Sequence, residues 1–233
     1  MKTIPIENLF ILLLPIAAVT WFYWKWVGKQ TELLIAVVRM ALQLILVGYA
    51  LEFIFNQNTS LWGLGVVSFM VVVSSWIALR VVENKTFRGY LEILAAVFVG
   101  GGINLVLVIF GVIQLDPWYE LKFLIPIAGM VFSNGMNALS IGIERFDKEL
   151  KTSNDFIQSR NNAFRVSMIP QVNALLAVGL VALPGMMTGQ ILSGVSPLIA
   201  VRYQIMVMAM LLGTAGLTLV AYFLIHRRSA EAV

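Results

Sequence analysis

The chain has 233 residues, of which 60% are hydrophobic and 12% charged, and its formal net charge is +4. A soluble domain of this length needs more polar residues to cover its surface, so the composition excludes an ordinary soluble protein and indicates a membrane protein. Cysteine is absent and His226 is the only histidine, which excludes a disulfide framework, a thiolate nucleophile and a multi-histidine cluster.

Several stretches are long and apolar enough to cross a bilayer, which takes roughly 20 residues of α-helix. In chain order, the seven stretches are Pro5–Trp26, Leu33–Phe55, Leu61–Val82, Tyr90–Ile113, Phe123–Ile143, Met168–Ile191 and Tyr203–Ile225. The alternating pattern of a β-barrel is absent, so we expect an all-α integral membrane protein. No linker, repeat or low-complexity tract divides the chain, and we expect residues 1–233 to form a single transmembrane domain.

Basic residues are distributed unequally between the two ends of these spans. One side holds only Lys2, Lys122 and Arg202, whereas the loops on the other side collect most of the remaining lysines and arginines. Cytoplasmic loops are enriched in these residues. We therefore expect the N-terminus outside and the C-terminus in the cytoplasm of a multi-pass protein of the inner (plasma) membrane. The longest polar segment, residues 144–167, then lies in the cytoplasm.

The middle of the fourth span contains three consecutive glycines, Gly100 to Gly102. Each glycine costs a helix about 1 kcal/mol relative to alanine, so the run needs a reason. It predicts either very close approach of a neighbouring helix or local unwinding, and close packing is the default in membrane helices.

The fifth span carries Met130, Asn134 and Asn137 at positions i, i+4 and i+7, which places them on one face of a helix. An amide in hydrocarbon is costly unless it has a hydrogen-bond partner, so this face should point to the bundle interior or to water. As a substrate pathway, it would offer oxygen and thioether ligands to a passing metal ion. As a structural face, it would form hydrogen bonds between helices, and we favour this interpretation.

The sixth span is interrupted by helix-breaking residues. The run Leu183–Gln190 contains Pro184, Gly185, Met186, Met187 and Gln190. A proline removes a backbone donor, and a broken helix at membrane depth is tolerated only where it is buried in protein or lines a cavity. The run is therefore either a hinge in a substrate pathway, moving during transport, or a rigid packing kink.

Four segments of the chain resemble signatures of one membrane-protein family. They are Arg39 with Gln43-Leu44 and Val47-Gly48-Tyr49; Ile125-Pro126-Ile127-Ala128-Gly129-Met130; Met168-Ile169-Pro170; and Leu183–Gln190 with Gly194-Val195-Ser196-Pro197-Leu198 and Arg202-Tyr203-Gln204-Ile205-Met206. They resemble, in order and over nearly the whole chain, the FetB-like family of iron-export permeases. Plant relatives in this family are linked to aluminium tolerance.

The resemblance implies the permease of an ABC transporter, a homodimer working with a separate cytoplasmic ATPase that binds ATP and Mg²⁺. We expect residues 144–167 to dock the ATPase, because they form the only cytoplasmic segment long enough to project from the membrane. The expected docking residues are Phe156, Ile157, Arg160, Phe164 and Arg165. This segment is shorter than in the family, by roughly a dozen residues, and lacks the Leu-Gly-Ala-type turn of the coupling helix.

No catalytic motif accompanies these features. The sequence lacks G-x-x-x-x-G-K-[ST] and G-x-S-x-G, so we expect a non-enzymatic chain that binds no cofactor of its own and no nucleic acid. The competing hypothesis is a secondary carrier or channel that needs no ATPase. Such carriers often have inverted repeats and intramembrane carboxylates, neither of which is evident here.

Overall fold

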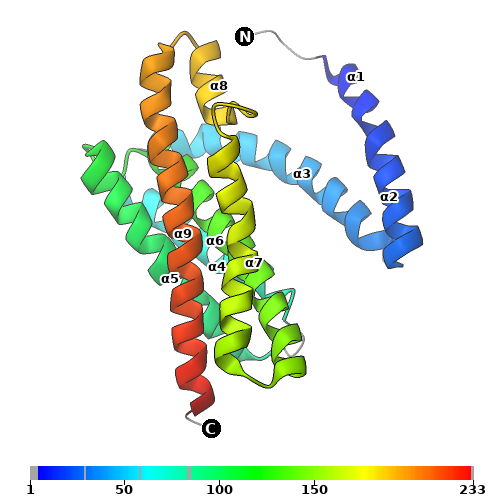
Figure 1. Ribbon diagram of the computed structural model, residues 1–233. Helices are drawn as coiled ribbons and strands as arrows, with labels where there is room; N and C mark the ends of the chain where they lie inside the picture. Colours follow the sequence, from blue (N-terminus) through cyan, green and yellow to red (C-terminus); the bar gives the residue numbers. More distant parts are fainter. Residues whose placement is uncertain (1–4, 29, 58, 83–84, 232–233) are drawn as a thin grey trace. The chain divides into compact units, whose positions relative to one another are not determined.

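The computed structural model describes residues 5–28, 30–57, 59–82 and 85–231 (Figure 1). Helices make up nearly all of these residues, and no β-sheet occurs among them, which confirms the all-α prediction. The chain divides into two compact units, Met1–Gln57 and Asn58–Val233, which are described separately. The expectation of one domain over the whole chain stays a prediction.

The first unit is a pair of long apolar helices. A short helix α1 (Ile6–Leu9) and a 3₁₀ turn η1 (Phe10–Leu12) lead into α2 (Leu13–Val27), and α3 (Gln30–Phe55) follows. Helix α2 ends at Gly28, which adopts the left-handed conformation that glycine tolerates best (φ 76°). The two helices meet near this turn, where the Tyr23 hydroxyl donates a hydrogen bond to Oε2 of Glu32 at 3.3 Å.

The second unit is a helical bundle. Its elements are α4 (Ser60–Leu79), α5 (Phe87–Val106), the π-helix η2 (Leu107–Ile113), α6 (Leu121–Ser153), α7 (Phe156–Ala177), α8 (Gly185–Leu192) and α9 (Pro197–Glu231). Helices α5, α6 and α9 pack against one another at the centre, α4 packs on α5 and α6, and α7 packs on α6 and α9. The buried core draws on all three central helices, for example Ile93, Leu139, Phe146 and Leu219.

Close packing explains the glycine run. A Cβ atom on Gly100 would lie 2.5 Å from the Cα atom of Thr218, and a Cβ on Gly101 would lie 2.8 Å from the ring of Phe132. Both distances are shorter than any normal contact between carbon atoms. The predicted close approach is therefore confirmed for α5 against α9 and α6. Regular α-helix continues through Gly102 and gives way to the wider π-helix only at Leu107.

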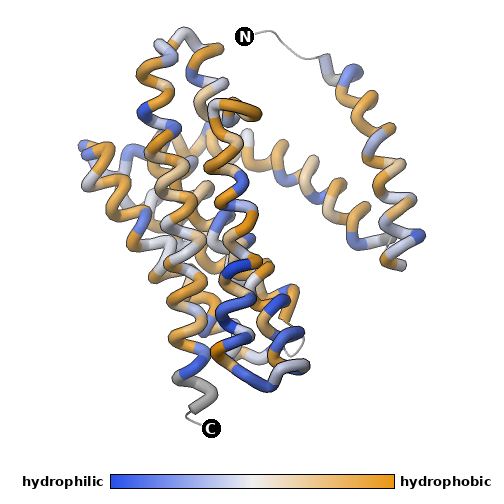
Figure 2. Tube along the Cα trace, in the orientation of Figure 1, coloured by the Kyte–Doolittle hydropathy of each residue, from blue (hydrophilic) through white to orange (hydrophobic). Residues whose placement is uncertain are grey.

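Six helices in the described residues are long and apolar enough to span a membrane, and they coincide with six of the seven predicted spans. They are Glu7–Val27, Thr31–Phe55, Ser60–Leu79, Phe87–Ile113, Leu121–Ser153 and Pro197–Arg227. Within the second unit, hydrophilic residues concentrate where α6 meets α7 (Figure 2).

The remaining predicted span, Met168–Ile191, is not one continuous helix. Helix α7 ends at Ala177, residues 178–184 are irregular, and α8 begins at Gly185. The expectation of an interrupted helix is confirmed, although the predicted position, Leu183–Gln190, is wrong for all but its first two residues. Pro184 is the last residue of the interruption and stands directly before α8. This is a favourable place for a proline, because its fixed φ suits the start of a helix and it would disrupt the interior of one.

Candidate functional site

A hydrogen-bonded bridge joins three helices at Asn134. Its Nδ2 atom donates to the backbone carbonyl of Leu211 on α9 at 2.7 Å. Its Oδ1 atom accepts a hydrogen bond from Nε2 of Gln171 on α7 at 2.8 Å. Since Asn134 belongs to α6, these two bonds tie α6, α7 and α9 together. Among the predicted pathway residues, Asn134 thus fits the structural interpretation, a hydrogen bond between packed helices.

Gln171 is the partner that sequence reasoning missed. It lies directly after Pro170 within α7, in a stretch that also contains Asn173. Two amides in an apolar span are a usable signal, because each needs a partner in hydrocarbon. The partner of Gln171 could not be named in advance, since the bond spans 37 residues of sequence.

The other two residues of the predicted α6 face lie in different surroundings. Met130 is half-buried and packs against the apolar core, whereas Asn137 is exposed on the surface of this unit. The side chain of Asn137 makes no hydrogen bond among the residues that the structure describes. Ser133, also exposed, donates only to the carbonyl of Met130 on its own helix, at 3.3 Å. The face therefore divides into an inner bridge and an outer polar stripe, Ser133 and Asn137.

The helix break after α7 is a tight loop that leaves backbone groups without their usual partners. The amide of Gly179 donates to the carbonyl of Ala182, and the amide of Leu180 donates to that of Ala177. In an uninterrupted helix these two amides would bond to the carbonyls of Leu175 and Leu176. Gly179 has φ +80°, a conformation that residues with a side chain rarely adopt.

Helix α8 begins immediately after the break. Pro184 is its N-cap residue, with φ −63° and ψ 149°, and the Pro184 carbonyl accepts the amide of Thr188 at 3.0 Å. Gly185 has an ordinary helical conformation, and the glycine of the break that adopts a positive φ is Gly179. Asn134, with its bonds to Gln171 and Leu211, does not partner the carbonyls that the break exposes.

Of the predicted pathway residues of α8, Met186, Met187 and Gln190 are half-buried and Gly185 is exposed. Met186 packs against the apolar core, and Met187 lines a pocket between the break and α9. The Oε1 atom of Gln190 is buried and has no hydrogen-bond partner in the described structure. The structure thus brings Met187 and Gln190 together on one short helix with Pro184 as its N-cap, and none of the three takes part in the hydrogen bonds of Asn134.

The predicted docking segment is the tip of a helical hairpin. Helix α6 continues to Ser153, and α7 begins at Phe156 after a turn at Asn154 and Asp155. Asp155 caps α7, since its Oδ1 atom accepts the amide of Ile157 at 2.8 Å and that of Gln158 at 3.1 Å. Across the hairpin, Nδ2 of Asn162 donates to Oε1 of Glu149 at 2.9 Å. Residues 144–167 therefore form the ends of two long helices and contain no separate coupling helix.

The five predicted docking residues differ in accessibility. Phe156 is half-buried because its ring packs edge-on against Phe146, with ring centroids 5.3 Å apart. Ile157 and Arg165 are exposed. Arg160 and Phe164 line a groove of about 390 Å³ between α7 and α9. Ile157, Arg160, Phe164 and Arg165 are therefore available to a partner at this end of the bundle, and Phe156 supports the hairpin.

A carboxylate–imidazole pair joins α5 to α9 near the same end. Oε2 of Glu92 lies 2.8 Å from Nδ1 of His226, and Oε1 of Glu92 lies 3.7 Å from Nε of Arg88. The His226 ring stacks on Tyr222 and meets the edge of Phe146. Nothing in the sequence links these two residues, which are 134 positions apart.

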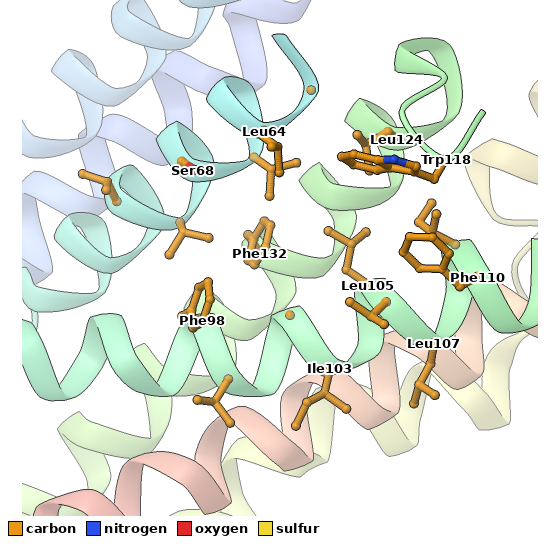
Figure 3. A pocket seen from close by; sticks show the side chains of 18 of the residues that line it. Leu64, Ser68, Phe98, Ile103, Leu105, Leu107, Phe110, Trp118, Leu124 and Phe132 are labelled. Atoms are coloured by element: carbon orange, nitrogen blue, oxygen red, sulfur yellow. The ribbon is translucent and has the colours of Figure 1, made fainter. Parts of the chain in front are cut away.

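A large cavity of the second unit is apolar (Figure 3). Its volume is about 700 Å³, and its walls come from α4, α5, η2 and α6. The side chains of Phe98, Ile103, Phe110 and Phe132 surround it, and Ser68 contributes a hydroxyl. A metal ion would lose its hydration shell there and meet no compensating ligands. The described residues also contain no group of three or more His, Cys, Asp or Glu that could hold a metal ion.

Together, the long apolar helices and the broken span define a multi-pass helical membrane protein. The family model of the Uncharacterised protein family (UPF0014) matches residues 6–230. The chain belongs to this family.

Three relatives are each 32% identical to this chain. The "Probable iron export permease protein FetB" of Escherichia coli (strain K12) aligns over 93% of this chain and 88% of its own length. The "UPF0014 membrane protein slr1647" of Synechocystis aligns over 88% and 85%. The "Protein ALUMINUM SENSITIVE 3" of Arabidopsis thaliana aligns over 91% and 80%. No solved structure matches the chain.

Proposed function

We propose that this chain is the membrane-spanning subunit of an ABC transporter in the plasma membrane and exports iron or a related metal species with ATP hydrolysed by a separate subunit. The observation that carries the proposal is the length of the α6–α7 hairpin. Helix α6 has 33 residues, or about 50 Å, whereas the hydrocarbon core of a bilayer is about 30 Å thick. About 20 Å of helix therefore extends beyond the lipid and presents a docking surface to a soluble partner.

The chemistry of the hairpin tip supports protein docking. Two ion pairs lie along the end of α6. Arg145 pairs with Glu149 at 2.6 Å, and Lys148 pairs with Glu144. These pairs stiffen the end of α6, while the exposed Ile157 and Arg165 on α7 offer one apolar and one cationic contact. An interface that combines an apolar anchor with an arginine has the composition of a binding hot spot. The name of the Escherichia coli relative supports iron as the first candidate substrate.

The docking part of the proposal is tested by stimulated ATPase activity in proteoliposomes that contain the chain and its candidate ATPase. Ile157→Asp and Arg165→Glu should weaken partner binding and reduce the stimulation at least several-fold. Arg202→Glu is the matched control, because Arg202 is equally exposed and lies at the start of α9, far along the chain from the hairpin. If both hairpin variants stimulate the ATPase as well as wild type does, docking lies elsewhere.

Metal transport is measured with the same vesicles. With the ATPase and ATP on the outside of the vesicles, iron should accumulate in the lumen only when hydrolysable ATP is present, because an exporter moves its substrate away from the side that holds the ATPase. Manganese and aluminium serve as comparison substrates. Iron movement at an equal rate without the ATPase would replace the proposal with an ATPase-independent carrier or channel.

The outer polar stripe of α6 supports the expected homodimer. Asn137 is exposed on the surface of the second unit, within the apolar part of α6, and a carboxamide without a partner in hydrocarbon costs several kcal/mol. A second copy that places its own Asn137 opposite would supply the missing hydrogen bond. Because the chain contains no cysteine, Asn137→Cys provides a clean test by oxidative cross-linking. We expect a cross-linked dimer at Asn137→Cys and none at the control Phe69→Cys, exposed on α4; equal cross-linking at both sites would contradict this arrangement.

A further inference from the structure

A second, smaller pocket lies against the helix break. Its volume is about 470 Å³, and it is lined by the end of α7, the irregular residues, α8 and α9. Its lining side chains include Leu175, Leu183, Met187, Ile205 and Met208, and the carboxamide of Gln204 is the one strongly polar side-chain group among them. A pocket of this size with apolar walls and few polar groups has the general character of a small-molecule site.

Gln204 is buried in a way that requires an explanation. The residue is 5% exposed, and its Oε1 atom is sealed from solvent without a hydrogen-bond partner in the described part of the chain. Leaving a buried amide oxygen unpaired costs about 1–3 kcal/mol. Buried polar groups in native proteins are normally hydrogen-bonded, so an unpaired one indicates a bound water, ion or ligand that completes it.

The backbone departs from the regular helical hydrogen-bond pattern at the same place. Leu175 lines the pocket, and the amide that would bond to its carbonyl in a continuous helix, that of Gly179, donates to Ala182 instead. Irregular backbone at membrane depth is tolerated where it lines a cavity that supplies polar partners. The buried carboxamide oxygen of Gln204 and the break in the helical hydrogen bonding therefore belong to the same pocket.

We propose that this pocket binds a small, neutral, largely apolar organic molecule that carries one hydrogen-bonding group, such as a hydroxyl. The apolar body lies against the leucine and methionine side chains, and the hydroxyl meets the carboxamide of Gln204. A bare metal ion fits poorly, because the lining contains no carboxylate, imidazole or thiolate to replace its hydration shell. The site is independent of ATP use, so it can be tested without the partner subunit.

Methionine methyl groups provide the measurement. The full-length wild-type chain, with 11 methionines, is labelled with ¹³C at the methionine methyl groups and studied by NMR in detergent micelles. The probes are 1-naphthol and 1-methylnaphthalene, which have similar shapes but differ in hydrogen bonding. We expect 1-naphthol to shift the resonances of Met187 and Met208 saturably and to leave those of Met70 and Met136 in place. One hydrogen bond should make 1-naphthol bind roughly 2- to 10-fold more tightly than 1-methylnaphthalene.

Two glutamine variants separate the proposed contact from general effects. Gln204→Leu should bind both probes equally, whereas the control Gln190→Leu should retain the preference for 1-naphthol, because Gln190 is outside the pocket lining. Equal binding of the two probes to the wild type overturns the proposal, and this comparison needs no variant to fold. Uniform shifts of all methionines would indicate partition into detergent and also overturn it. Selective broadening of Met187 and Met208 by Mn²⁺ would overturn it in favour of a cation site.

Discussion

Replacing Gly100 with alanine perturbs the contact between α5 and α9 at its tightest point. The new Cβ atom would lie 2.5 Å from both the Cα and the backbone nitrogen of Thr218. Carbon atoms in contact prefer about 3.5–4.0 Å, so the helices must separate by on the order of 1 Å. Overpacking costs about 1–3 kcal/mol, and a clash with backbone atoms belongs at the upper end of that range. Alanine recovers about 1 kcal/mol of helix propensity, which leaves a net loss of about 2 kcal/mol.

The neighbouring glycines provide a graded control for this prediction. A Cβ on Gly102 meets nothing within 4 Å, so Gly102→Ala should be neutral or more stable by up to about 1 kcal/mol. Gly101→Ala should fall between the two, because the ring of Phe132 that it meets at 2.8 Å can move. The assay is the free energy of unfolding in mixed micelles titrated with sodium dodecyl sulfate, followed by circular dichroism. Equal free energies for Gly100→Ala and Gly102→Ala would refute the packing argument.

Three further predictions concern other parts of the chain. Asn134→Leu and Gln171→Leu should each lower the unfolding free energy by about 1 kcal/mol. A coupling energy near zero in the double-mutant cycle would show that the hydrogen bond between Asn134 and Gln171 contributes nothing to stability. Asp155→Ala removes the side-chain acceptor of two backbone amides at the start of α7 and should lower the unfolding free energy by about 0.5–2 kcal/mol in the same assay. Asp155→Asn keeps an acceptor oxygen and should lower it much less. Equal losses for the two variants would contradict the capping role. In intact cells a membrane-impermeant maleimide should label a cysteine at Gln57 and spare one at Lys85, and the opposite pattern would reverse the expected orientation.

Local sequence determined which segments form helices and which of them are apolar enough for a bilayer. Six predicted spans correspond to helices within a few residues at most boundaries, because runs of about 20 apolar residues have few alternatives in lipid. The larger boundary differences occur in two helices. Helix α6 continues for about ten residues past the end of its predicted span, and α9 begins about six residues before the start of its predicted span. At the end of α6 the chain leaves the apolar run and stays helical, where ion pairs such as Arg145 with Glu149 and the bond from Asn162 to Glu149 support it.

Composition could also indicate where something unusual would occur, without fixing its form. The proline and glycines of Leu183–Gln190 indicated a broken helix, and the structure has a break from residue 178 to residue 184. Its position depends on Gly179, whose positive φ allows the loop to close on the end of α7. A lone glycine in an apolar span gives no such signal, because most glycines in membrane helices serve packing.

The partners of polar side chains were decided by tertiary structure alone. Asn134 meets Gln171 and Leu211, and Glu92 meets His226, across 37, 77 and 134 residues of chain. The sequence determined that these groups need partners, because an unpaired polar group in an apolar medium is costly. Which residue becomes the partner depends on how each helix is rotated and how deep it lies in the bundle. Close contacts such as Gly100 against Thr218 determine both, and they form only when the helices pack.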